Sequence, residues 1–155
     1  MFIRFFILMS LLLGACAPMV DETGQARQAL ADFFSHLEQG EYAGAQELYG
    51  GSYEILIGFN PSLDPDEHTA LWRNACTLNG FQCLDVRNAT FNELTGEGEY
   101  IFTVEFNNPD GTLFVLGPCC GATEAEMPPV SQFEYRVIED AVGNYVVLDL
   151  PVYVP

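Results

Sequence analysis

The sequence predicts an α+β domain in which N-terminal helices pack on one face of a curved antiparallel β-sheet. Two observations support this fold class. Apolar residues recur at helical spacing through the first half of the chain, and after Gly80 the period changes to two, which is typical of strands. Helices that precede a series of strands joined by turns indicate an α+β layer.

Three helices are expected before the sheet. In Thr23–Gln39 the apolar residues form one stripe, and a glycine follows. Glu41–Tyr49 repeats this pattern over a shorter length. The third helix is expected to start within Asp64–Glu67, which offers an N-cap acid, a proline at the first helical position and a glutamate at the third. It is expected to run to Leu78, before an Asn-Gly pair.

The second half of the chain is expected to form a meander of strands. Cys83–Leu94 is a less regular strand whose phase slips between Val86 and Ala89, as a bulge would cause. Glu99–Phe106 alternates cleanly, and after an Asn-Pro-Asp-Gly turn Thr112–Leu116 is expected to return beside it.

Two further strands are expected near the C-terminus. Gln132–Val137 alternates between apolar and polar residues, and Gly143-Asn144 is expected to turn it into Tyr145–Val154. Because Tyr145–Val154 is apolar on both faces, we expect it at the centre of the sheet. Gly117–Pro129 is the one long irregular segment.

The N-terminus has the features of a secretory signal peptide. Arg4 is the only charge in Met1–Ala15, and Phe5–Leu13 is an apolar run too short to cross a membrane as a helix. Leu13-Gly14-Ala15-Cys16 resembles the lipobox of bacterial lipoproteins. The alternative is an ordinary signal peptide, cut after Ala15 by the general peptidase.

The lipobox resemblance implies that Cys16 carries the lipid and becomes the first residue of the mature protein. The membrane would then be a partner through this lipid, and the protein would lie in the bacterial cell envelope, outside the cytoplasm. Residues 16–23 would form a short tether, and residues 24–155 a single domain.

The charge of the chain excludes one large class of function. The part after Ala15 contains four arginines, no lysine and all 22 acids, so its formal charge is −18. Nucleic-acid binding needs cations that displace counterions from phosphates, so no nucleic-acid partner is expected. No metal or cofactor is expected either, because no calcium loop or other metal-binding motif is present.

Four cysteines remain for disulfides if Cys16 is lipidated. The favoured pairing joins Cys76 to Cys83 across a small ring and leaves Cys119 and Cys120 as a vicinal pair. In the alternative pairings, Cys119 and Cys120 each form a disulfide with one of Cys76 and Cys83. A four-thiolate zinc site is disfavoured because the usual C-x2-C spacing is missing.

The domain itself shows a family resemblance. The pattern Ala29-x3-Phe33-Phe34-x2-Leu37-x2-Gly40-Glu41-Tyr42-x2-Ala45-x2-Leu48-Tyr49 is similar to the first two helices of the nuclear transport factor 2-like (NTF2-like) domains. The resemblance implies a cone with a pocket between the third helix and the concave sheet. Some relatives are isomerases or dehydratases, and many others are non-catalytic binding or accessory domains.

His68 is the weak catalytic candidate, since it shares the helix face of Leu71 and Ala75 and a neutral histidine can act as a base. His36 is weaker still. Six further side chains could line the pocket if their strand faces point inward. They are Tyr100, Tyr135, Tyr145, Asp85, Asp149 and Arg136.

The sequence favours a non-enzymatic binding or accessory module that takes an envelope protein or a small apolar ligand. The alternative is a small lyase or isomerase that uses His68 as its acid or base.

Overall fold

A computed structural model describes residues 21–155, so the signal peptide and Cys16 lie outside the described residues. The helices come first: α1 (Glu22–Glu38), α2 (Tyr42–Glu47), α3 (Glu54–Phe59) and α4 (His68–Thr77). The strands β1 (Val86–Leu94), β2 (Tyr100–Phe106), β3 (Phe133–Glu139) and β4 (Tyr145–Val147) form one antiparallel sheet in the order β1-β2-β3-β4. The predicted α+β class, with helices before strands, is confirmed.

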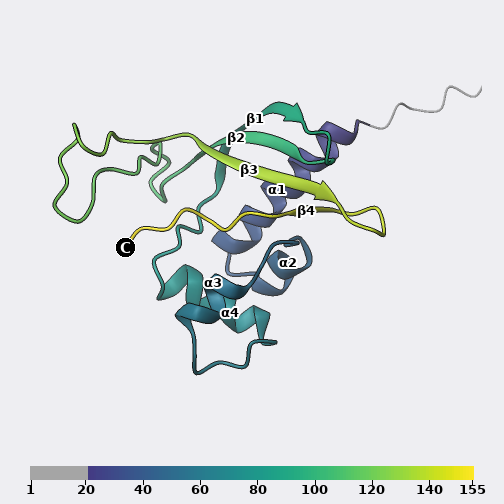
Figure 1. The fold of residues 1–155 in the computed structure, drawn as a ribbon, viewed down its shortest axis with the longest axis horizontal. Helices are drawn as coiled ribbons and strands as arrows, with labels where there is room; N and C mark the ends of the chain where they lie inside the picture. Colours follow the sequence, from purple (N-terminus) through teal and green to yellow (C-terminus); the bar gives the residue numbers. More distant parts are fainter. Residues whose placement is uncertain (1–20) are drawn as a thin grey trace, which may run out of the picture.

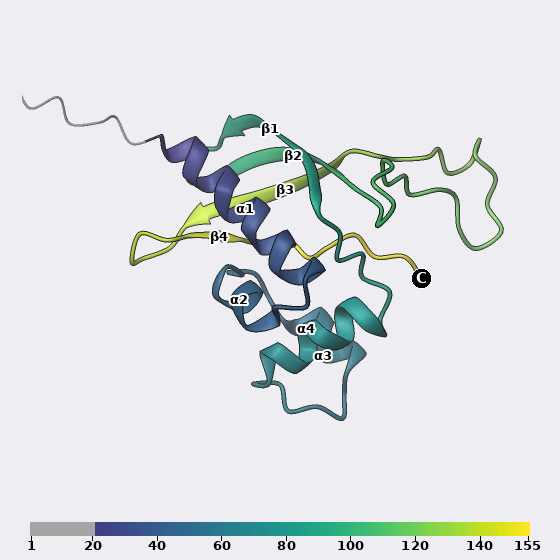
Figure 2. The same cartoon turned by 180° about the vertical axis from the view of Figure 1, so that it is seen from behind.

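Helix α1 lies across one face of the sheet, while α2, α3 and α4 gather beyond the β4 edge (Figures 1 and 2). Asp21 is the N-cap of α1, and its carboxylate accepts the backbone N–H of Gly24 at 3.0 Å and so satisfies one of the free N–H groups of the first turn. The predicted apolar stripe of α1 packs against the strands and the other helices. Ala29 is only partly buried, and the fully buried members are Ala26, Leu30, Phe33, Phe34 and Leu37.

Two helices differ from the expectation. The start of α4 within Asp64–Glu67 is wrong, because the Asp64 carboxylate accepts the N–H of Asp66 at 3.0 Å and closes a local turn. The helix begins at His68 and ends at Thr77, one residue before the expected Leu78. Helix α3 was not expected at all: it is six residues long, and only Leu56 among them is fully buried.

The strands also differ in two places. Thr112–Leu116 is not a strand, since only isolated bridges join Asn107 to Leu113 and Leu116 to Val130. The expected bulge in β1 is present as a register shift between Val86 and Asn88.

The predicted strand Tyr145–Val154 is much shorter and lies at the edge of the sheet rather than at its centre. Its apolar character has another cause. The outer edge of β4 is covered by the chain after α2, where the backbone N–H of Val147 donates to Leu48 and the N–H of Gly50 donates to Val147. Tyr145, Val146 and Val147 are therefore buried in an edge strand.

Candidate functional site

The space between the helices and the concave face of the sheet is filled by aromatic side chains. Phe34 lies against Phe106 and Tyr135, with ring centroids 4.7 and 5.0 Å apart. Phe33 packs against Trp72 of α4 at 5.5 Å. All five rings are almost completely buried. The pocket that the family resemblance implies is thus occupied by the protein's own core in the part of the chain described here.

His68 lies at the outer end of this aromatic cluster. Its ring stacks on Tyr53 with the centroids 3.8 Å apart and the planes 7° from parallel. The Tyr53 hydroxyl in turn accepts a hydrogen bond from the indole N–H of Trp72 at 3.1 Å. His68 is partly exposed and lines a shallow, open hollow of about 310 Å³ with Asp66, Glu67 and Arg73 among others. Within residues 21–155 its ring makes no hydrogen bond to a carboxylate.

His36 is partly exposed and interacts with Glu41. Its Nδ1 lies 2.7 Å from a carboxylate oxygen of Glu41, just beyond the end of α1. The imidazole also covers Gly44 so closely that a Cβ there would lie 3.0 Å from the ring. His36 therefore ties the end of α1 to the start of α2.

The tyrosines that were candidates for the pocket are part of the core or its rim. Burial raises the pKa of Tyr135 and of Tyr100, so both hydroxyls stay protonated at neutral pH. The Tyr100 hydroxyl donates to Glu22 at 3.1 Å and thereby ties β2 to the first turn of α1. Tyr145 packs against Tyr100 at 5.6 Å and borders an open hollow.

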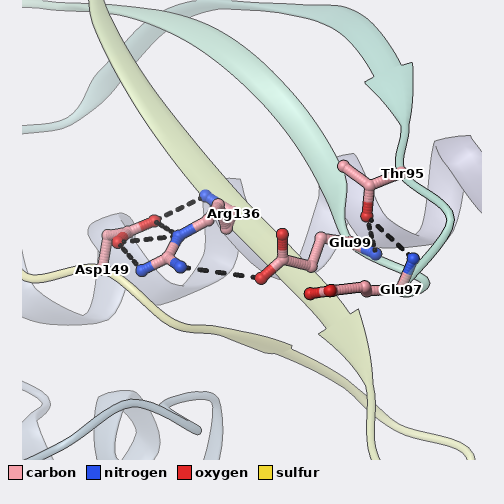
Figure 3. A network of polar contacts seen from close by, with 5 residues as sticks. All are labelled: Thr95, Glu97, Glu99, Arg136 and Asp149. Atoms are coloured by element: carbon pink, nitrogen blue, oxygen red, sulfur yellow. Dashed lines mark hydrogen bonds and ion pairs between the residues drawn. The ribbon is translucent and has the colours of Figure 1, made fainter.

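Arg136 and Asp149 form a strong ion pair outside the filled core, and Figure 3 shows that Glu99 approaches the same guanidinium. The shortest contact joins Nη2 of Arg136 to Asp149 at 2.6 Å, and Nε donates to the same carboxylate at 3.1 Å. Hydrogen bonding to Asp149 raises the pKa of Arg136 further. Since two carboxylates already neutralise this arginine, it is not free to bind an anion.

Asp85 is exposed at the entrance to β1 and lines a different hollow of about 600 Å³, which also contains Glu38, Asn107 and Asn108. It therefore does not meet Arg136, Asp149 or His68. The structure distributes the sequence-predicted site residues over separate surfaces and does not assemble an acid–base pair from them.

One surface hollow was not anticipated by the sequence. This α1–β4 hollow, of about 470 Å³, lies where α1, the end of α2 and the β3–β4 turn meet. Amides and acids dominate its polar lining, and the residues are Gln25, Gln28, Ala29, Asp32, Glu47, Leu48, Gly143, Asn144 and Tyr145. Gln28 and Asp32 are oriented by a hydrogen bond of 2.8 Å along the helix. These residues come from an outer helix face, the end of α2, a turn and the start of β4, and no spacing pattern in the sequence marks them as a group.

The cysteines behave as two separate pairs. Cys76 at the end of α4 and Cys83 before β1 lie at disulfide distance, with Cα atoms 5.4 Å apart. Cys119 and Cys120 are not bonded to each other, and their sulfur atoms lie 2.8 Å apart. Their vicinal disulfide stays a prediction.

Within residues 21–155 there is no cluster of three metal-binding side chains, and no helix is both long and apolar enough to span a bilayer. Comparison of the chain with protein-family models, with curated proteins and with solved structures finds no match.

Proposed function

We propose that this protein is a lipoprotein of the bacterial cell envelope, held outside the cytoplasm by lipid on Cys16, whose domain acts as a non-enzymatic binding or accessory module. The apolar run Phe5–Leu13 and the Leu13–Cys16 motif support this location in the cell envelope. Cys16 precedes Asp21, the N-cap of α1, by only five residues, which keeps the domain within about 20 Å of its anchor even when the chain is extended.

The filled interior is the observation that favours a partner on the outer surface over a ligand inside the domain. Ligand pockets are usually preformed concave spaces of about 300–1,000 Å³ that bury most of the ligand. Here Phe33, Phe34 and Trp72 occupy the corresponding space, and each is 0% exposed. A small apolar ligand inside the cone is therefore less well supported than an envelope protein that contacts the outer surface.

The α1–β4 hollow is the surface that we assign to this contact. Its rim offers amides from Gln28 and Asn144 and carboxylates from Asp32 and Glu47, but no cation. Such a rim accepts and donates hydrogen bonds and repels anions, so it suits a neutral or basic polar segment of a partner.

The lyase or isomerase alternative has less support from the geometry. A histidine that acts as a base needs a substrate within hydrogen-bond reach, and a partner that orients its ring. His68 instead stacks flat on Tyr53 at the edge of an open hollow.

Photo-crosslinking in intact cells tests both parts of the proposal. A photoreactive amino acid replaces Gln28, in the hollow, and in a matched control it replaces Thr90, an exposed residue of β1. We expect a discrete crosslinked protein at Gln28 alone, and its loss when Cys16→Ser releases the domain from the membrane. Equal products at both positions, or none at either, would contradict the assigned surface. A crosslink that persists unchanged in the Cys16→Ser protein would contradict the role of the anchor.

A further inference from the structure

The connection between β2 and β3 contains two adjacent cysteines. Much of residues 107–132 extends beyond the end of the sheet in both views (green in Figures 1 and 2), although Phe114 packs into the core. Cys119 and Cys120 lie in this connection, and Cys120 is exposed. The Cys76–Cys83 pair is less accessible, because both of its members are partly buried and pack against the core.

The local backbone is folded so that the two sulfur atoms face each other. Cys120 and Gly121 both have positive φ, 60° and 90°, and the N–H of Ala122 donates to the carbonyl of Cys119 at 3.0 Å. This is the pattern of a tight turn in which both central residues are left-handed. Among residues 21–155, Cys120 is the one non-glycine residue with positive φ.

A left-handed conformation at a residue other than glycine, asparagine or aspartate is uncommon, and it is often retained where function requires it. In this turn it brings Sγ of Cys119 to 2.8 Å from Sγ of Cys120. A short turn of chain follows, in which Glu126 accepts both the N–H and the hydroxyl of Thr123 at 2.9 Å. The backbone hydrogen bond from Ala122 to Cys119 thus closes the turn that brings the two thiols together, and neither cysteine belongs to the core cluster.

The two cysteine pairs differ in how easily a disulfide fits them. Neighbouring Cα atoms are about 3.8 Å apart, whereas ordinary disulfides join Cα atoms about 4.4–6.8 Å apart. A bond between Cys119 and Cys120 would therefore close a strained ring, and strained, exposed disulfides are the ones most readily reduced. Cys76 and Cys83, at 5.4 Å, lie within the ordinary range.

We propose that Cys119 and Cys120 form a reversible thiol–disulfide couple that exchanges with small disulfides and thiols, while the Cys76–Cys83 disulfide stays oxidised. The first thiolate attacks one sulfur of the external disulfide, breaks its S–S bond and releases one thiol. The second thiolate then attacks the protein sulfur of this mixed disulfide and releases the second thiol. Two protein thiols are oxidised by two electrons, the external disulfide is reduced, and the two protons pass to the released thiolates.

Cys120 is the expected first nucleophile because it is the more exposed of the two. The hydrogen bond with Cys120 also raises the pKa of Cys119, which disfavours the thiolate there. Cys119 then acts as the resolving thiol.

Redox equilibration of the purified full chain tests this proposal. The protein is equilibrated over a series of ratios of reduced to oxidised glutathione and quenched in acid. Its thiols are then alkylated and located by peptide mass spectrometry. We expect Cys119–Cys120 to pass from dithiol to disulfide within the series while Cys76–Cys83 stays oxidised throughout. A Cys119–Cys120 pair that remains a dithiol at every ratio, or that is reduced only together with Cys76–Cys83, would overturn the proposal.

Single variants separate the roles of the two thiols. We expect Cys119→Ser to accumulate a stable mixed disulfide between Cys120 and glutathione, because the resolving thiol is missing. In the wild-type protein this adduct should be only transient. If the wild-type protein accumulates the glutathione adduct to the same extent as Cys119→Ser, the two cysteines do not act as a couple.

Discussion

The carboxylate of Asp149 accepts hydrogen bonds from both the backbone and the side chain of Arg136. Its Oδ2 lies 2.7 Å from the Arg136 backbone N, and its Oδ1 lies 2.6 Å from Nη2. The N–H of Leu148 still donates to the carbonyl of Arg136, so the ladder of β4 continues by one bond. The Asp149 side chain then replaces the backbone acceptor that a regular strand would supply, and Pro151 has no N–H with which to continue the ladder. This pair therefore sets where β4 ends.

We expect Asp149→Ala to lower the free energy of unfolding by about 1–2 kcal/mol, because it leaves a partly buried N–H of Arg136 without its acceptor. Asp149→Asn retains an acceptor for that N–H and should cost less. Glu99→Gln is the control, since its contact with Arg136 is longer, at 3.6 Å, and a surface ion pair of this kind contributes about 0–1 kcal/mol. Urea denaturation checks the order. Equal losses for Asp149→Ala and Glu99→Gln would contradict it.

His68 is expected to act through packing rather than through its nitrogen atoms. Its ring covers Tyr53 at 3.8 Å. His68→Phe should therefore keep the thermal stability of the wild-type protein, whereas His68→Ala should lose about 0.5–1.5 kcal/mol, the size of an aromatic pair interaction. Thermal unfolding measures both. If His68→Phe is as unstable as His68→Ala, the stacking does not account for the residue.

The β3–β4 turn is expected to weaken in acid. Hydrogen bonds from the backbone of Asn144 and Val142 to Asp140 lower the pKa of this carboxyl below 3.8, the value of an unperturbed aspartate. A group with a lowered pKa stabilises the fold above its unfolded pKa, and this contribution is lost as pH falls through the folded pKa. Asp140→Asn should thus be less stable than wild type at pH 7, with the difference shrinking below about pH 3.8.

Thermal unfolding at a series of pH values measures this difference. Glu97→Gln removes the same charge from a carboxylate for which the structure shows no hydrogen bond, so it is the matched control and should show no such loss at pH 7. A stability difference for Asp140→Asn that is constant from pH 7 to pH 3 would contradict the assignment to the charged carboxylate.

The Cys76–Cys83 disulfide is expected to stabilise the fold. Cross-linking residues separated by seven positions removes loop-closure entropy from the unfolded chain worth about 2.5 kcal/mol. The Cys76→Ser/Cys83→Ser protein should lose stability of this order in denaturant. The Cys119→Ser/Cys120→Ser protein is the matched control and should lie within about 0.5 kcal/mol of wild type, because that pair does not contact the core. Equal stability of the two double variants would contradict the structural role of Cys76–Cys83.

The sequence predicted those elements whose burial is periodic. The stripe of α1 and the alternation of β2 repeat over several turns or residue pairs. The expected inward face of β2 is buried, although Ile101 on its other face is buried as well. Helix α3 lacks such a repeat: Ile55 and Phe59 are apolar but about half exposed, so the pattern does not distinguish a face. The end of β4 depends on the side chain of Asp149, which accepts a hydrogen bond that a backbone carbonyl would accept in a regular strand. Residue propensities do not predict such a side-chain acceptor.

The candidate site was the least predictable part for a related reason. His68 is partly exposed, unlike the fully buried Leu71, and it lies in the first turn of a helix that starts later than expected, where Tyr53, the N-cap of α3, covers it. Since α3 was not foreseen, neither was the contact between its N-cap, Tyr53, and His68. Whether a concave sheet holds a cavity depends on side-chain volume, and here Phe34 and Trp72 fill it.

The mass of the N-terminal peptide of the mature protein tests the central proposal most directly. The full chain is expressed in a bacterium that processes lipoproteins, extracted from membranes with detergent and digested, and its N-terminal peptide is then measured. We predict a peptide that begins at Cys16 and carries the mass of a diacylglycerol, alone or with an added N-acyl chain. A peptide that begins at Cys16 without lipid, or one that still begins at Met1, would contradict it.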